Sequence, residues 1–305
     1  MAVYTPVGEA ALERFLADYR LGAVRGFEPI PEGIDNTNYL LETSSGRYVL
    51  TLFENRIDPA DLPFFVDLMD YLAVRGVPCP APVRRSDGTS LAPLAGRTAL
   101  IVSFLEGERD PGAFRAIGEA LGRLHLAGDG FPSRRPNDLG PEGWRRLAAL
   151  TSARADEVAP GLARRISGTL TELAPNWPGS LPDGAIHADL FPDNAVFRDG
   201  AVSGIYDFYF ACTDALAYDL AIAQVAWTVD PEGRFDARAS AEMQEGYEAV
   251  RPLEPVELLA LPHLRRGAAL RFLLTRLHDW LHPAPAALMT PKDPLEYLRK
   301  LDGLS

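Results

Sequence analysis

The strongest constraint on this chain is the spacing of polar residues in the segment 187–208. The segment opens with HADLFPDN, which places Asp189 and Asn194 five positions apart. Two short apolar stretches follow, joined by RDG at 198–200, which is a signal for a tight hairpin turn. Asp207 comes directly after the second stretch. Because a hairpin returns the chain to the edge where it started, the spacing predicts that Asp207 lies beside the HADLFPDN loop.

An aspartate, an asparagine five positions later and an Asp-Phe pair beyond a hairpin match the pattern of a phosphoryl-transfer loop. Asp189 would align an acceptor hydroxyl and take its proton. Asn194 and Asp207 would bind Mg²⁺, which screens the transferred charge. The alternative is an acidic surface turn, or a kinase-like fold without activity. Four fixed positions match by chance only about once in several hundred tries, so we favour catalysis.

Three further polar residues near this pattern favour structural roles. We expect His187 to pack under the loop and to hydrogen-bond its backbone, although contact with a substrate is the alternative. His125 lies on a predicted helix, where we expect a histidine with satisfied partners. Asp219 lies in the apolar stretch AYDLA. We expect it to cap the helix or to brace the loop that carries Asp189, although contact with a substrate is the alternative.

The charge of the chain limits its partners. The formal net charge is −12 and the sequence pI is about 4.9. A negative field of this size disfavours nucleic acid and anionic membrane surfaces. It fits a small substrate, which could be cationic, and it requires a divalent metal if the protein binds a nucleotide triphosphate.

Cysteine usage and hydropathy favour a cytoplasmic protein. The two cysteines, Cys79 and Cys212, are far apart and form no CxxC pair, so a disulfide framework or a zinc site is not expected. The first fifteen residues lack the basic and apolar regions of a signal peptide. The longest apolar run, 215–229, is interrupted by Asp219 and is too short to span a bilayer.

The first hundred residues predict a small antiparallel sheet with one helix packed beside it. Tyr39–Leu41 and Tyr48–Phe53 are predicted strands joined by a turn at 44–46, and 78–108 predicts two or three more strands. Residues 59–75 predict the helix.

The rest of the chain is predicted to be mostly helical, with one hairpin at 194–208. The predicted helices are 111–127, stretches within 141–173, 215–229, 238–250 and 255–281. Asp110 is the expected N-cap of the first of these, with Pro111 at its first position. The class is therefore α+β, with a β-rich segment 1–105, a larger helical segment 106–305 and a boundary near Leu105.

Several segments together resemble one known family. HADLFPDN followed by IYDF and AYDLA is similar to the aminoglycoside phosphotransferase and choline kinase superfamily, which has a protein-kinase-like fold. EGIDNTNYLLETSSGRYVLTLFE, LPFFVDLMDYLAVRGVPCPAPV and IYDFYFACTDALAYDLAIAQVAWT resemble its homoserine kinase branch. The resemblance covers nearly the whole chain. It implies a bilobal kinase that uses ATP and Mg²⁺ to phosphorylate L-homoserine in threonine biosynthesis.

The resemblance also implies residue roles. It makes Asp189 the catalytic base and makes Asn194 and Asp207 the metal ligands. It assigns nucleotide binding to the lobe 1–105 and catalysis to 106–305. Within the first lobe, it implies that the phosphate loop and the adenine-binding hinge contain Gly33, Asn36, Thr37, Asn38, Ser103, Phe104 and Leu105.

The chain departs from the family at one position of the nucleotide site. The phosphate-binding lysine of the family would stand on the strand YVLTLFE, where this chain has Thr51. The following helix offers Asp61, Asp67 and Asp70 but no glutamate to complete the usual ion pair. The interpretation is that Mg²⁺ and the backbone N–H groups of residues 33–38 hold the phosphates.

The remaining candidates are residues that would bind the substrate. Asp193 and Asp214 are candidates for the ammonium group of homoserine. Arg271 is a candidate clamp for its carboxylate, with His278 nearby on the shoulder of an apolar helical stripe; a solvated shoulder is the alternative. Three functions stay open: a homoserine kinase, a kinase of this fold for a choline-like alcohol or an amino sugar, and a non-catalytic nucleotide-binding module.

Overall fold

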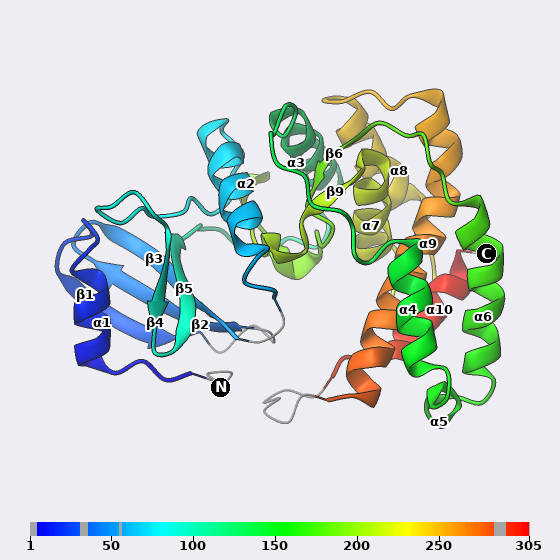
Figure 1. Cartoon of the computed structure of the whole chain (residues 1–305). Coiled ribbons are helices and arrows are strands. Elements are labelled where there is room, and N and C mark those ends of the chain that lie inside the picture. The colour runs from blue at the N-terminus through cyan, green and yellow to red at the C-terminus, as the bar shows by residue number, and fades with distance from the viewer. Residues whose placement is uncertain (1–4, 31–35, 55–56, 284–290, 305) are drawn as a thin grey trace. The chain divides into compact units, whose positions relative to one another are not determined.

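The computed structural model of the chain describes residues 5–30, 36–54, 57–283 and 291–304. The described chain forms two compact units, one reaching Glu106 and the other beginning at Gly107 (Figure 1). The functional division, with nucleotide binding in 1–105 and catalysis in 106–305, stays a prediction. Within the described residues, no helix is long and apolar enough to cross a membrane.

The first unit is built on a five-stranded antiparallel sheet in the order β1-β2-β3-β5-β4. Its strands and helices are β1 (Val24–Pro29), β2 (Asn36–Thr43), β3 (Gly46–Phe53), β4 (Leu91–Leu94), β5 (Arg97–Ser103), α1 (Glu9–Leu16) and α2 (Leu62–Val74). Leu12 and Phe15 of α1 join a buried cluster with Leu41 and Leu50 of the sheet. The antiparallel sheet predicted from the first hundred residues is therefore confirmed.

Strand β2 begins at Asn36, three positions before the predicted strand at Tyr39. The strand begins with the polar residues NTN, which are not typical of a strand, but Thr37 and Asn38 have hydrogen-bond partners in the structure. Thr37 donates from its hydroxyl to Glu54 at 2.7 Å. Asn38 accepts a hydrogen bond from the hydroxyl of Thr51 at 2.8 Å. Pairing with β3 and these side-chain partners outweigh the low strand propensity of the sequence.

The second unit is mostly helical. Its helices are α3 (Phe114–Ala127), α4 (Pro141–Thr151), α5 (Ala155–Val158), α6 (Leu162–Leu173), α7 (Leu216–Thr228), α8 (Ala237–Glu248), α9 (Pro255–Leu281) and α10 (Pro294–Gly303), with short 3₁₀ turns η1 (Ala174–Asn176), η2 (Pro192–Asn194) and η3 (Phe208–Phe210). Two small antiparallel sheets pair β6 (Asp183–Ile186) with β9 (Cys212–Ala215), and β7 (Ala195–Arg198) with β8 (Ala201–Ile205).

The start predicted for α3 is wrong. The helix begins at Phe114 instead of Pro111, and its N-cap position is Ala113. Asp110 accepts a hydrogen bond from the backbone N–H of Gly112 at 3.0 Å. This bond closes a local turn, so the side chain that was expected to cap the helix stabilises the turn before it.

Helix α9 forms the centre of the second unit. It begins with a capping box, in which Glu254 and Glu257 exchange side-chain and backbone hydrogen bonds. All residues of the segment 267–274 are buried. The helix contacts α4, α6, α7 and α10, and therefore its middle is covered on every side. A helix buried all round belongs to the core.

Helices α3 and α8 approach each other closely because glycine stands at both contact points. A Cβ atom added at Gly118 would lie 1.9 Å from the backbone oxygen of Met243. A Cβ atom added at Gly246 would lie 2.2 Å from the backbone oxygen of Arg115. Backbone atoms cannot move aside as a flexible side chain can, so any larger residue forces the helices apart.

We therefore expect Gly118→Ala to destabilise the fold by about 1–3 kcal/mol, the usual range for an overpacked core. Gly168 is the matched control, because it is also a helical glycine but a Cβ atom there would meet nothing within 4 Å. Gly168→Ala should stabilise the protein by about 0.5–1 kcal/mol. Urea denaturation of both variants checks this, and equal midpoints would contradict the close approach of the helices.

Candidate active site

The predicted hairpin is present and has the expected bounds. Strand β7 pairs with β8, with Ala195 opposite Ile205. The backbone N–H of Tyr206 donates to the carbonyl of Asn194 at 2.8 Å. This bond closes the hairpin at the residue before Asp207. It therefore brings the second aspartate back beside the loop, as the spacing predicted.

Asn194 is hydrogen-bonded to Asp189. Its Nδ2 donates to the backbone oxygen of Asp189 at 2.8 Å and to the Oδ2 atom of the same residue at 3.2 Å. This use of the amide nitrogen leaves the Oδ1 atom of Asn194 available as an oxygen ligand. The asparagine can thus orient the carboxylate with one atom and bind a hard cation with the other.

Asp189 and Asp207 act on each other through their negative charges. Burial, followed by the negative charge of Asp207, raises the pKa of Asp189 to about 8. The carboxylates of Asp189 and Asp207 and the amide oxygen of Asn194 are hard oxygen donors of the kind that Mg²⁺ prefers. Among the described residues, no group of three or more His, Cys, Asp and Glu side chains could hold a metal ion. A metal at Asp207 and Asn194 would therefore need phosphate oxygens or water to complete its coordination.

The backbone at this site is held in an uncommon conformation. Ala188 has φ of 62° and Asp207 has φ of 59°. Only four non-glycine residues of the described chain have positive φ, and these are two of them. Left-handed backbone at a non-glycine residue costs free energy and persists only where its surroundings impose it.

His187 packs under the loop, as the sequence predicted. Its Nε2 donates to the carbonyl of Tyr206 at 2.7 Å, and its Nδ1 accepts from the backbone N–H of Asp189 at 3.1 Å. Its ring meets the ring of Phe208 edge to face. Burial lowers the pKa of His187, and both nitrogens are used by the backbone. The side chain is therefore a neutral support for the loop.

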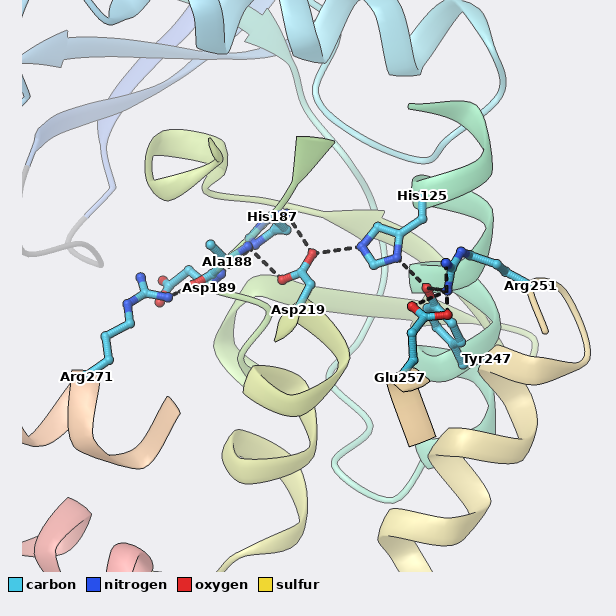
Figure 2. Close-up of polar contacts among 9 residues, drawn as sticks. All are labelled: His125, His187, Ala188, Asp189, Asp219, Tyr247, Arg251, Glu257 and Arg271. Carbon is cyan, nitrogen blue, oxygen red and sulfur yellow. Dashed lines mark hydrogen bonds and ion pairs between the residues drawn. The ribbon is translucent and has the colours of Figure 1, made fainter. Parts of the chain in front are cut away.

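Asp219 braces the loop from helix α7, which confirms the second of its predicted structural roles. Its carboxylate accepts the backbone N–H groups of His187 and Ala188 at 2.7 and 2.8 Å. It also pairs with Nε2 of His125 at 3.0 Å (Figure 2). Burial alone would raise the pKa of Asp219, but the bonds from these partners outweigh it and lower the pKa.

The support of Asp219 continues into a buried chain of polar groups. Nδ1 of His125 lies 2.7 Å from the hydroxyl of Tyr247. Arg251 donates to the same hydroxyl at 3.1 Å, and it pairs with the fully buried Glu257 at 3.0 Å. Since Arg251 only donates, the Tyr247 hydroxyl keeps its own proton for Nδ1 of His125. Nε2 of His125 can then donate to Asp219, so that every group of this network has a partner (Figure 2).

Part of this hydrogen-bonded network, from Asp219 to Glu257, was predictable from the sequence, and the rest was not. The expectation of a satisfied buried histidine at His125 is confirmed. Tyr247, Arg251 and Glu257 were missed, because they lie on or beside α8 and α9, more than a hundred residues after His125. No local spacing in the sequence signals their meeting.

The predicted nucleotide residues of the first unit occupy strand ends. Asn36, Thr37 and Asn38 open β2, whereas Gly33 lies outside the described residues. Thr51, which is buried, bonds Asn38 across the two strands. Their predicted contact with phosphates stays a prediction.

The predicted hinge follows directly from β5. Ser103 is the last residue of the strand, and its hydroxyl accepts the backbone N–H of Ala81 at 2.9 Å. The backbone N–H of Phe104 donates to the carbonyl of Arg47 at 3.1 Å. Adenine recognition by residues 103–105, including Leu105, stays a prediction.

The predicted substrate residues differ in burial and in their partners. Asp193 is exposed and lies 3.6 Å from Arg109. Asp214 accepts a hydrogen bond from Asn137 at 2.7 Å, and burial raises its pKa. His278 is partly exposed and lies 3.4 Å from Asp279.

Arg271 is not a solvated shoulder residue, so that alternative is wrong. The side chain is only 1% exposed. The apolar stripe predicted for this helix extends around the whole middle of α9, because other helices cover it on every side.

Comparison with known proteins identifies the family. Residues 26–253 match the model of the phosphotransferase enzyme family. The chain belongs to this family. It is also 54% identical to the homoserine kinase of Methylobacterium nodulans over 305 residues, which covers 99% of this chain and 95% of that protein. The family resemblance seen in the sequence is thus confirmed.

Solved structures of other kinases share the fold of this phosphotransferase. Amicoumacin kinase hAmiN, solved with AMP-PNP, Ca²⁺ and Ami, matches with a TM-score of 0.70 at 14% identity, over 97% of this chain and 92% of that chain. Choline kinase from Cryptosporidium parvum Iowa II matches with a TM-score of 0.66 at 15% identity, over 92% and 88%. These matches confirm the predicted α+β, protein-kinase-like class.

Removal of the Tyr247 hydroxyl tests the buried chain. We expect Tyr247→Phe to destabilise the phosphotransferase by about 1–3 kcal/mol, because Nδ1 of His125 loses its donor and Arg251 loses an acceptor. Tyr297→Phe is the control. Tyr297 is also fully buried, but its hydroxyl has no hydrogen-bond partner within the described structure. Thermal unfolding should show a lower melting temperature for Tyr247→Phe alone. Equal melting temperatures of the two variants would contradict the hydrogen bonds described for the Tyr247 hydroxyl.

Proposed function

We propose that this phosphotransferase transfers the γ-phosphoryl group of ATP to the side-chain hydroxyl of L-homoserine, giving O-phospho-L-homoserine and ADP. The observation that carries the proposal is the 54% identity, over nearly the full length of both chains, to a homoserine kinase. The described site supports it, because Asp189, Asn194 and Asp207 lie together and are the residue types of a phosphoryl-transfer loop.

In this proposal, Asp189 is the base. The acceptor hydroxyl oxygen attacks the γ-phosphorus, the bond from phosphorus to the β,γ-bridging oxygen breaks, and ADP leaves with that electron pair. The hydroxyl proton passes to the carboxylate of Asp189. A pKa of about 8 makes Asp189 a stronger base than an ordinary aspartate. The hydrogen bond from Asn194 holds the accepting oxygen in place.

We assign Mg²⁺ to Asp207 and Asn194, where it would screen the charge on the ATP phosphates. The assignment rests on the donor set, since a carboxylate and an amide oxygen are hard ligands. We further propose that this metal and backbone N–H groups of residues 33–38 replace the strand lysine of the family. Thr51 cannot supply a charge, and its hydroxyl is engaged by Asn38.

The recognition of homoserine is assigned to three polar residues. Asp193 and Asp214 are the candidates for its ammonium group, and His278 is a candidate at the edge of the substrate site.

Cys79 and Cys212 are both free and buried, which fits the reducing cytoplasm where we place the reaction.

An acceptor panel tests the substrate. We expect kcat/KM for homoserine to exceed the values for serine, threonine, choline and an aminoglycoside in a coupled ADP-release assay with Mg·ATP. If another acceptor exceeds homoserine tenfold, the substrate is wrong although the kinase assignment stands. If no acceptor stimulates ADP release, the chain is a nucleotide-binding module.

Substitution of the base tests the mechanism. Asp189→Asn should lower kcat by about 10²–10⁴-fold, the usual contribution of a positioned base. Its melting temperature should not fall, because the raised pKa of Asp189 means that the folded state disfavours the charged carboxylate. Asp199→Asn is the control, since Asp199 lies on the exposed turn of the same hairpin, where its positive φ suits asparagine. More than a tenth of wild-type kcat in Asp189→Asn would refute the assignment.

A further inference from the structure

Arg271 places a permanent positive charge in the core of the second unit. The guanidinium group stays protonated in proteins. Its side chain is 1% exposed and lies within the fully buried segment 267–274 of α9. A buried charge is costly unless its surroundings compensate it. The contacts of this arginine should therefore explain why a charge is kept there.

The hydrogen bond that Arg271 makes is directed at the active-site loop. Its Nη1 donates to the carbonyl of Ala188 at 2.5 Å. The guanidinium group also lies 4.6 Å from the ring centre of Phe272 and 5.7 Å from that of Phe210, which are cation–π distances. Within the described structure, its Nε has no hydrogen-bond partner.

The carbonyl that Arg271 binds belongs to the peptide group between Ala188 and Asp189. The N–H of the same peptide group donates to Nδ1 of His187 at 3.1 Å. The preceding N–H, that of Ala188, donates to Asp219 at 2.8 Å. Arg271 and Asp219 thus reach the loop from two helices, α9 and α7 (Figure 2).

These bonds explain how a left-handed alanine persists. With φ of 62°, Ala188 would relax to an ordinary conformation if its peptide groups were free to turn. Asp219 fixes the N–H side of the residue, and Arg271 fixes the carbonyl side. The direction in which the Asp189 side chain leaves the backbone depends on this peptide plane.

We propose that Arg271 is a positioning residue of the active site, which fixes the Ala188–Asp189 peptide group so that Asp189 faces the acceptor hydroxyl. This proposal rests on the proposed role of Asp189 as the base. It differs from the carboxylate clamp predicted from the sequence. A clamp would present two parallel N–H groups to a substrate, whereas the hydrogen bond described for Arg271 goes to the loop backbone and the side chain is 1% exposed.

A peptide group held in this way sets the direction of the Asp189 side chain without touching a substrate. The positioning role therefore predicts a change in turnover and no change in substrate binding.

Steady-state kinetics on Arg271→Met and Arg271→Lys test the proposal, with the best acceptor of the wild-type enzyme. Arg271→Met removes the donor and should lower kcat about 10–100-fold, since small misplacements of a reacting group have effects of this order. The KM values for the acceptor and for ATP should stay near those of the wild type. Arg271→Lys keeps a charge and a donor, with shorter reach, so its kcat should lie between the two.

The control is Arg276→Met on the same helix. Replacement of Arg276 also breaks an ion pair, the one with Glu296 at 2.6 Å. Within the described structure, the hydrogen bonds of Arg276 go to Glu296 and to the carbonyl of Asp293, and none goes to the loop. Its kcat should match the wild type. Circular dichroism and titration with nucleotide give the fraction of folded sites, so that kcat is expressed per folded site.

Wild-type kcat in either folded Arg271 variant would overturn the proposal. If that unchanged kcat came with a raised KM for the acceptor, the arginine would bind the substrate as a clamp instead. If Arg271→Met does not fold, Arg271→Lys decides alone by the same criteria. Asp189→Asn in the same assay separates the two proposals. An inactive Asp189→Asn with fully active Arg271 variants removes only the positioning role, whereas an active Asp189→Asn removes the proposed mechanism.

Discussion

The rest of the second unit depends on the hydrogen bonds that the carboxylate of Asp219 accepts. This carboxylate accepts two consecutive backbone N–H groups of the loop and one imidazole N–H group, all within 3.0 Å. A fully buried charge is costly unless hydrogen bonds or ion pairs compensate it. The lowered pKa of Asp219 shows that its partners outweigh its burial. The loop is thereby anchored to the core helix α7.

Helix packing connects this anchor to the rest of the unit. Glycines at the crossing of α3 and α8 let His125 meet Tyr247, and the capped start of α9 provides Glu257 to hold Arg251. Farther along α9, an arginine reaches the other side of the loop. The strained backbone beside the proposed base is thus stabilised from several helices, which is how a fold can hold a reactive group in place.

The sequence predicted those features of the site that depend on local spacing. Asp189, Asn194 and Asp207 could be found because a loop and a short hairpin bring them together within twenty residues. The extended chain beyond His125 could not be found, because its members meet only through helix packing. Arg271 was predicted to bind the substrate carboxylate, but its burial was missed. An apolar stripe on a helix predicts one buried face, and nothing in the sequence of α9 indicates that other helices cover all of its faces.

The most direct test of the account is a crystal structure with a non-hydrolysable ATP analogue, Mg²⁺ and L-homoserine. We expect the acceptor hydroxyl within about 3.2 Å of the Asp189 carboxylate, the distance that proton transfer requires. We also expect Mg²⁺ bound to Asp207 and to Oδ1 of Asn194, with Arg271 on the Ala188 carbonyl and not on the substrate. A metal bound away from these two residues, or a hydroxyl out of reach of Asp189, would contradict the account.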